Sequence, residues 1–366
     1  VDAVRTCLTV IAIAAVVAVI LILEGFNEGL LAQLRRAVTD RGADLIVTQS
    51  GVSNMIAARS ILPQFARQDV EAVRGVAAAH PLTGIPVIYN QDGQRTPIFL
   101  LVYDSGGGPT RLVRGTTNKH SRDIVIDRSV VRKYALELGD PFIISDFEFR
   151  VAGISEGTAA LFTPFGFVRY DDLIDFYFES DIAADISTFP LLSFLLVELA
   201  AGAEPSVVAA AIEGAVPDGD VFLPGALAGE DAALGRMLFG PVLKLLIAVG
   251  YVIGVLVIGI IMFAAVSARR RDFGVLKALG FSHSVLSLSV VLEALVLALA
   301  AVPFGAALAA LMAWAIETIM PPYSILAAEP AAVLRTSIAC LGFAGLGASA
   351  PIFLIRRLDP AIAFRS

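Results

Sequence analysis

The fold is decided by residues 242–297, which read VLKLLIAVGYVIGVLVIGIIMFAAVSARRRDFGVLKALGFSHSVLSLSVVLEALVL. The run 242–266 carries no charge except Lys244 near its first residue. A helix needs roughly 20 apolar residues to cross the hydrocarbon layer of a bilayer, so this run is long enough to span it. The basic segment Arg269–Arg271 follows, and a second apolar run starts near Ser284. The stretch therefore predicts two membrane spans joined by a short basic connection.

The composition of the whole chain agrees with a membrane protein. Of the 366 residues, 57% are apolar and only 17% are charged, whereas a soluble domain has about 25% charged residues. The charge is concentrated in residues 24–240, which hold 17 of the 27 basic and 28 of the 34 acidic residues. This pattern excludes a wholly soluble enzyme, a disordered chain and a nucleic-acid-coating protein.

Four apolar runs are long enough to be helical spans, and the charged block lies between the first two. The sequence therefore predicts a membrane protein with four transmembrane α-helices and a large α+β extracytoplasmic domain inserted between helices 1 and 2. The predicted segments are the spans 1–23, 241–268, 284–316 and 332–355, the extracytoplasmic domain with its stalk segments 24–240, a cytoplasmic helix 269–283, a short outer loop 317–331 and a cytoplasmic tail 356–366.

The distribution of arginine predicts the orientation. Short cytoplasmic loops are enriched in Lys and Arg, and Arg5, Arg269–Arg271 and the pair Arg356 and Arg357 all fall on one side if both termini are cytoplasmic. Residues 24–240 are then outside. No A-x-A-like cleavage site follows residue 23, which favours a retained anchor over a cleaved signal peptide. Because the chain opens at Val1 almost inside a span, we expect a cytoplasmic segment upstream of it.

The charged block alternates short strands with short helices. Strands are predicted at residues 43–48, 85–89 and 96–102, and a helix at 128–138 that ends at Gly139. The pattern indicates an α+β domain with a mixed sheet. The segment Ser105–Pro109 contains three consecutive glycines without the Gly-Lys-Ser/Thr ending of a phosphate-binding loop, so it is predicted to be a flexible loop.

No catalytic or metal-binding pattern stands out in the block. Residues 119–123, Lys-His-Ser-Arg-Asp, contain the residue types of a catalytic triad, but immediate neighbours rarely supply its geometry, and a polar segment before a strand is favoured. The three histidines are scattered, and both cysteines, Cys7 and Cys340, lie in predicted spans. The sequence therefore predicts no metal site and a protein that is not an enzyme.

The segment after residue 268 predicts a small amphipathic helix at the cytoplasmic surface. Phe273, Leu276 and Leu279 are placed roughly on one face, Gly280 is a natural helix end, and Ser282 can cap the next span. An interfacial loop that only follows the positive-inside rule would explain the arginines. It would not explain the apolar face or the tight Gly-Phe-Ser turn.

The chain resembles the MacB/FtsX-type permeases of ABC transporters in three places. The cytoplasmic segment Arg271–Gly280 (RDFGVLKALG) is similar to the family's signature, although Asp-Phe stands where Glu-Ile is usual. In the block, IVID at 124–127, LGD at 138–140 and FRVAGI at 149–154 are similar to the core of the family's external domain, and RRLDPA at 356–361 is similar to its tail. The segments 42–47 and 51–55 look most like the DevC-like branch.

The resemblance implies a permease subunit in the bacterial cytoplasmic (inner) membrane. The chain has no G-x-x-x-x-G-K-[ST] motif, so a dimer of a separate ABC ATPase would bind ATP and Mg, and the chain itself needs no cofactor. The residues expected to form the coupling helix that contacts this ATPase are Arg271, Asp272, Phe273, Gly274, Val275, Leu276, Lys277, Ala278, Leu279, Gly280 and Phe281. Further expected partners are a second permease copy, membrane lipids and a periplasmic adaptor (membrane fusion) protein, with no nucleic acid.

The chemistry of a few other side chains predicts roles at the membrane surface and inside the spans. Arg269, Arg270, Arg356 and Arg357 are positioned to meet anionic lipid headgroups. Gly250 and Gly254 permit close helix packing. Glu293 is an acid inside a span, for which a functional role and a structural bond to a neighbouring helix both remain open.

Two functions fit these features. The first is ATP-driven outward movement of a lipid or other amphipathic substrate, in which the stalk transmits motion to the outer domain. The alternative is an FtsX-like signalling permease that activates a cell-wall hydrolase without transporting a substrate. The apolar segment 161–167 (LFTPFGF) would suit a substrate-contacting patch or a buried strand.

Overall fold

The computed structural model describes residues 2–56, 60–63, 65–144, 146–179, 192–349 and 351–353. Arg356, Arg357 and the predicted tail 356–366 lie outside the described residues. The chain divides into two compact units. The first, here called the helical unit, comprises residues 1–29, 239–319 and 325–366, and the second, the sheet unit, comprises residues 30–238 and 320–324.

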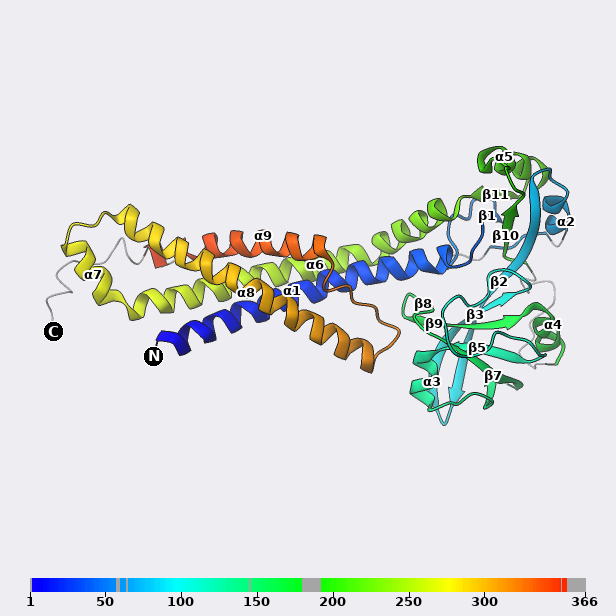
Figure 1. The fold of residues 1–366 in the computed structure, drawn as a ribbon, viewed down its shortest axis with the longest axis horizontal. Helices are drawn as coiled ribbons and strands as arrows, with labels where there is room; N and C mark the ends of the chain where they lie inside the picture. The colour runs from blue at the N-terminus through cyan, green and yellow to red at the C-terminus, as the bar shows by residue number, and fades with distance from the viewer. Residues whose placement is uncertain are drawn as a thin grey trace. The chain divides into compact units, whose positions relative to one another are not determined.

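The helical unit is built from long apolar helices that run side by side (Figure 1). Within the part of the chain that the structure describes, four helices are long and apolar enough to cross a membrane, as the sequence predicts. The helices that contribute to this unit are α1 (Asp2–Thr39), α6 (Pro224–Ala268), α7 (Arg270–Ala278), α8 (His283–Ile319) and α9 (Pro330–Gly347). Residues 30–39 of α1 and 224–238 of α6 belong to the sheet unit, so each of these helices has residues in both units.

Small residues bring these helices close together, as is usual in membrane proteins, where packing replaces the hydrophobic effect between helices. The core is rich in buried alanine from α1, α8 and α9. A Cβ atom added at Gly305 of α8 would lie 2.6 Å from the Val17 side chain of α1. Gly254 of α6 packs against Val16 of α1 and Phe343 of α9, and Gly250 faces Ile20 and Leu23 of α1. Both of these glycines therefore make contacts within the chain.

The sheet unit contains an 11-stranded mixed sheet whose main path is β11-β1-β10-β2-β3-β9-β5-β7-β4. The pairs β3–β9 and β5–β7 are parallel and the other pairs are antiparallel. The strands are β1 (Leu45–Gln49), β2 (Val76–Gln91), β3 (Gln94–Tyr103), β4 (Leu112–Gly115), β5 (Asp123–Asp127), β6 (Pro141–Ile144), β7 (Phe147–Ser155), β8 (Ala159–Ala160), β9 (Thr163–Arg169), β10 (Phe194–Leu199) and β11 (Gly219–Phe222). The predicted α+β class with a mixed sheet is confirmed.

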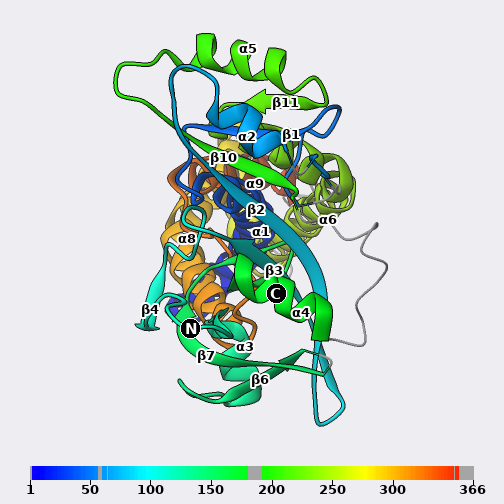
Figure 2. The ribbon, with the colours of Figure 1, turned by 90° about the vertical axis from the view of Figure 1, so that its right-hand side faces the viewer.

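Four short helices cover parts of this sheet: α2 (Ala66–Glu71), α3 (Arg128–Tyr134), α4 (Tyr170–Glu179) and α5 (Pro205–Ala215). Figure 2 shows α2 and α5 beside β1, β10 and β11, and α3 beside β6 and β7 farther along the unit. The long strand β2 extends through both of these regions of the sheet, because its first half pairs with β10 and its second half pairs with β3. The hairpin turn between β2 and β3 has positive φ at Asp92 and Gly93, as is usual for an Asp-Gly turn between two strands.

Two local predictions in this unit are wrong. The helix predicted at 128–138 ends at Tyr134, because Ala135 adopts a left-handed conformation with φ of 52°. The glycines of Ser105–Pro109 are closely packed: added Cβ atoms would lie 2.6 Å from His80, 2.5 Å from Leu196 and 2.7 Å from Tyr103. This segment needs glycine because side chains of the sheet leave no room for a Cβ.

The apolar segment 161–167 includes the buried strand residues Phe165 and Phe167 and so favours the buried-strand interpretation.

Candidate functional site

The helix α7 has one apolar face inside the protein and another exposed to solvent. Phe273 is 9% exposed and packs in the core of the helical unit, and Leu276 packs against the same core. Val275, Leu279 and Phe281 are 43%, 71% and 48% exposed. The sequence-based prediction that Phe273 and Leu279 share one face is therefore wrong. Val275 lies in α7, Leu279 is its C-terminal cap and Phe281 follows in the turn. These three exposed apolar residues are called the outer face of α7 below.

The connection from α7 to α8 is a tight turn. Gly280 has a φ of 92°, its N–H donates to Lys277 O at 3.1 Å, and the N–H of Phe281 donates to Leu276 O at 3.2 Å. Ser282 then accepts the N–H of Val285 on its Oγ at 3.4 Å, and α8 begins at the next residue. Both the predicted glycine stop and the predicted serine cap are confirmed. The turn fixes the outer face at a defined place between two spans.

The intramembrane acid Glu293 bonds to the connection that precedes α7. Arg269 Nη1 lies 3.2 Å from Glu293 Oε1, which joins the end of α6 to α8. Of the two interpretations left open for Glu293, this geometry favours the structural bond. The ion pair with Glu293 occupies Arg269. The next three residues, Arg270, Arg271 and Asp272, are exposed.

A polar cluster joins α1, α6 and α9 elsewhere in the helical unit. The Tyr251 hydroxyl donates to Glu24 Oε1 at 2.7 Å, and Arg335 Nε and Nη2 each donate to Glu24 Oε2 at 3.3 Å. Arg335 also lies 3.6 Å from Glu28 Oε1. The Glu24 side chain is only 8% exposed. Sequence reasoning missed this cluster because its members are far apart along the chain, although two charges at the ends of predicted spans were a signal.

A buried arginine just after α1 bonds to the loop that follows β3. Arg41, 4% exposed, donates from Nη1 to Gly107 O at 2.7 Å and to Gly108 O at 3.3 Å. Its guanidinium lies 5.2 Å from the centroid of the Phe167 ring. Burial lowers the pKa of Arg41 to about 10, with Asp40 acting in the opposite direction, so the side chain stays charged at neutral pH.

Replacing Arg41 with methionine should destabilise the full chain by about 1–3 kcal/mol. The change keeps apolar bulk but leaves the carbonyls of Gly107 and Gly108 without this donor. The thermal unfolding midpoint of the purified protein measures the effect. Arg35→Met, at an exposed position of α1, is the matched control and should leave the midpoint nearly unchanged.

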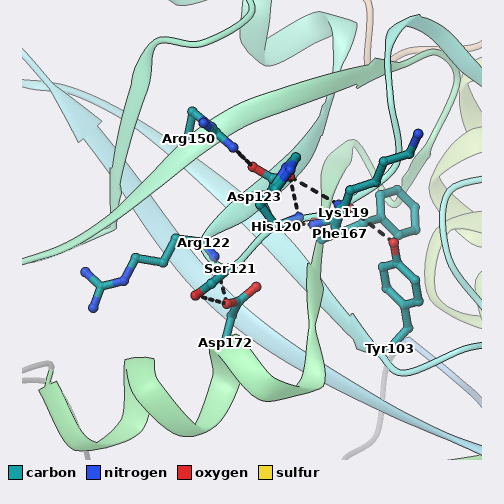
Figure 3. Close-up of polar contacts among 10 residues, drawn as sticks. Tyr103, Lys119, His120, Ser121, Arg122, Asp123, Arg150, Phe167 and Asp172 are labelled. Carbon is teal, nitrogen blue, oxygen red and sulfur yellow. Dashed lines mark hydrogen bonds and ion pairs between the residues drawn. The ribbon is translucent and has the colours of Figure 1, made fainter.

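The predicted polar segment before β5 forms a network around Asp123 (Figure 3). The Asp123 side chain, 1% exposed, accepts from Arg150 Nη2 at 2.6 Å and from the backbone N–H groups of Lys119 and His120 at 3.1 and 2.9 Å. Ser121 Oγ instead donates to Asp172 at 3.0 Å. The serine therefore belongs to a different hydrogen bond from the histidine, and the arrangement is that of a structural anchor for the strand and not of a catalytic triad.

Removing Arg150 should make the stability of the protein depend less on pH. Burial raises the pKa of Asp123, but hydrogen bonds from Arg150 and from two backbone N–H groups outweigh it, so the pKa lies below its ordinary value. The bonds then stabilise the fold above the ordinary carboxyl pKa, and this stabilisation is lost as the pH falls through the lower folded-state pKa. Arg150→Met should lower the thermal midpoint at pH 7, and the gap to the unchanged protein should close in acid. A difference in thermal midpoint that stays the same from pH 7 into acid would contradict a role of the ion pair in stability.

Comparison with known proteins identifies the family. Residues 6–215 match the model of the MacB-like periplasmic core domain, and residues 244–360 match the FtsX-like permease C-terminal model. Two uncharacterised ABC transporter permeases of Mycobacterium tuberculosis, Rv0072 and Rv2563, are 23% and 25% identical over 98% of this chain and 95% of their own length. The chain belongs to the MacB/FtsX-type ABC transporter permeases. It is a multi-pass membrane protein with an extracellular segment.

Two solved structures resemble part of the chain. The periplasmic region of MacB from Actinobacillus actinomycetemcomitans has 12% sequence identity and a TM-score of 0.36, and covers 52% of this chain and 95% of that one. The extracellular domain of the noncanonic ABC-type transporter YknZ from Gram-positive bacteria has 12% identity and a TM-score of 0.38, over 50% of this chain and all of that one. The DevC-like branch stays a prediction.

Proposed function

We propose that this permease couples ATP hydrolysis by a separate ATPase subunit to the outward movement of an amphipathic substrate. The observation that carries the proposal is the outer face of α7. Its residues Val275, Leu279 and Phe281 are exposed, while Phe273 on the same helix is anchored in the core. A rigidly held helix with an exposed apolar face suits a groove on a partner protein. The partner would bind ATP and Mg, because the chain has no phosphate-binding motif.

The same proposal fixes the orientation. With α7 on the cytoplasmic side of the inner membrane, both termini are cytoplasmic and residues 24–240 lie outside. The exposed arginines Arg270 and Arg271 then face the cytoplasmic surface, where anionic lipid headgroups attract basic side chains by about 1 kcal/mol each. An ATPase dimer would require two such helices and hence a second permease copy, and an adaptor would contact the outer domain.

Two continuous helices support a mechanical route to the outer domain. Both α1 and α6 contribute to the helical unit and to the sheet unit without a break. In the sheet unit, Leu34 and Val38 of α1 and Leu227 of α6 are buried in one core with residues of β1, β2 and β9. The buried Asp231 of α6 accepts the backbone N–H of Met55 at 3.1 Å. Movement of the spans would therefore be passed to the sheet.

Gentle purification of the permease with its bound molecules tests this function against the signalling alternative. The complex is extracted in mild detergent, and mass spectrometry identifies both the bound proteins and the bound lipids. We expect an ABC ATPase together with an amphipathic molecule. An ATPase with a cell-wall hydrolase and no amphipathic molecule would favour signalling and contradict transport.

A further inference from the structure

The helical unit contains a cavity of about 510 Å³ that none of the roles above uses. The end of α8 and the segment 325–329 form its walls. Seven of the nine lining residues are apolar, including Trp314, and the other two are Glu317 and Glu329. None of the nine described residues that line it is a lysine or an arginine. The cavity is therefore apolar with negative charge only.

Hydrogen bonds hold the walls of this cavity in place. Glu317 Oε1 accepts the backbone N–H of Ile325 at 2.7 Å, which ties the segment to α8. The N–H of Leu326 donates to Gly25 O of α1 at 2.9 Å, and Ala327 is 2% exposed. A Cβ at Gly25 would lie 2.5 Å from Ala327 N, so the segment is packed directly on α1. The cavity has a built wall and an oriented carboxylate.

The chemistry of the lining selects the sign of the charge on a ligand. The two carboxylates attract a cation and repel phosphate or sulfate, and no basic residue of the lining offsets them. Trp314 is 66% exposed, so its indole ring is available to an ammonium group by cation–π attraction. The remaining wall of alanine, isoleucine and leucine suits an alkyl chain. A molecule with one cationic group and an apolar body satisfies all three parts.

We propose that this cavity is a binding site for amphipathic cations, with Glu317 and Glu329 receiving the charge and Trp314 contacting it. The inference rests on the proposed function, since it names the class of amphipathic substrate that the permease moves. The ammonium group can belong to a free amphiphile or to a phosphatidylethanolamine headgroup. The test therefore separates these two sources.

The single tryptophan of the chain makes the site directly observable. Trp314 is the only tryptophan in the sequence, so emission excited at the red edge of the tryptophan absorption band, where the seven tyrosines absorb little, reports on this cavity. The full chain is placed in nanodiscs of digalactosyldiacylglycerol, a lipid whose headgroup carries neither a charge nor an ammonium group, and titrated with decyltrimethylammonium, and in parallel with decyl sulfate. We expect a saturable change in emission with the cation and none with the anion.

The variants are chosen so that the charge changes while the structure stays. Glu317→Gln keeps an amide oxygen that accepts the N–H of Ile325, and it is combined with Glu329→Gln. In this double variant, the decyltrimethylammonium concentration at half-saturation should rise at least about tenfold. Glu230→Gln, an exposed carboxylate of α6, is the matched control and should leave binding unchanged. A change in emission that does not saturate, or that is the same in the double variant, would be partition into the bilayer and would overturn the site.

A second lipid composition identifies the source of the cation. If phosphatidylethanolamine added to the nanodiscs competes with decyltrimethylammonium, the site accepts a lipid headgroup, and if it does not, the site accepts a free amphiphile. Both results support the proposal. The titration needs no ATPase, so its failure would overturn the cation site alone. Retention of the ATPase by a folded variant of the outer face of α7, measured separately, would overturn the proposed function.

Discussion

Aspartate at both Val275 and Leu279 should abolish co-purification of the ATPase subunit with the permease. Both side chains are on the outer face of α7, 43% and 71% exposed, so the change does not disturb the core. In a docking groove, each lost apolar side chain would cost about 1.5–3 kcal/mol, and a desolvated carboxylate would cost more. A total of about 3–5 kcal/mol corresponds to a loss of affinity of roughly 10²- to 4 × 10³-fold. Affinity purification of a tagged permease followed by quantification of the ATPase measures it.

The control variants separate docking from folding. Val113→Asp changes a valine of similar exposure on β4, 47% exposed, and should leave co-purification intact. The thermal midpoint of the double variant should equal that of the unchanged protein. Leu276→Asp is unsuitable, because Leu276 packs against the core and its loss would destabilise the helical unit. A double variant that is folded and still retains the ATPase would exclude α7 as the docking helix.

Local sequence chemistry predicted the parts of this region that depend on neighbouring residues. The end of α7 at Gly280 follows from the ability of glycine to adopt positive φ, and the start of α8 follows from the serine cap. The four apolar runs predicted the membrane-crossing helices because length and hydropathy decide that property. Helical periodicity alone could not decide which apolar residues of α7 face the core, because both sides of this short helix carry apolar residues.

Features that depend on distant segments were beyond the sequence. The glycines at 106–108 predicted a flexible loop. In the structure, glycine is needed at these positions because His80, Leu196 and Tyr103 of the strands leave no room for a Cβ atom. The pairing of Glu293 with Arg269 requires α6 and α8 to be neighbours, which spacing along the chain does not show. The cavity beside Trp314 likewise arises where segment 325–329 folds against α8. In each case the missing information was which elements lie side by side.

The polar cluster at Glu24 provides the second large expected effect. Arg335→Ala should destabilise the helical unit by about 2 kcal/mol, because Glu24 would be left 8% exposed without its positive partner. The value is set below the ~3–5 kcal/mol of a fully buried pair, since the Arg335 side chain keeps 53% of its surface exposed. Thermal unfolding of the full chain in detergent measures the change.

A double variant distinguishes an uncompensated charge from lost packing. Glu24→Gln removes the charge but keeps an oxygen that accepts the Tyr251 hydroxyl, so combining it with Arg335→Ala should restore much of the lost stability. Arg128→Ala is the comparison, because it breaks a surface pair with Glu156 in which both side chains are well exposed, and it should cost no more than about 1 kcal/mol. If the double variant is as unstable as Arg335→Ala alone, the arginine acts through its packing, and the Glu24 charge contributes nothing to the joining of α1, α6 and α9.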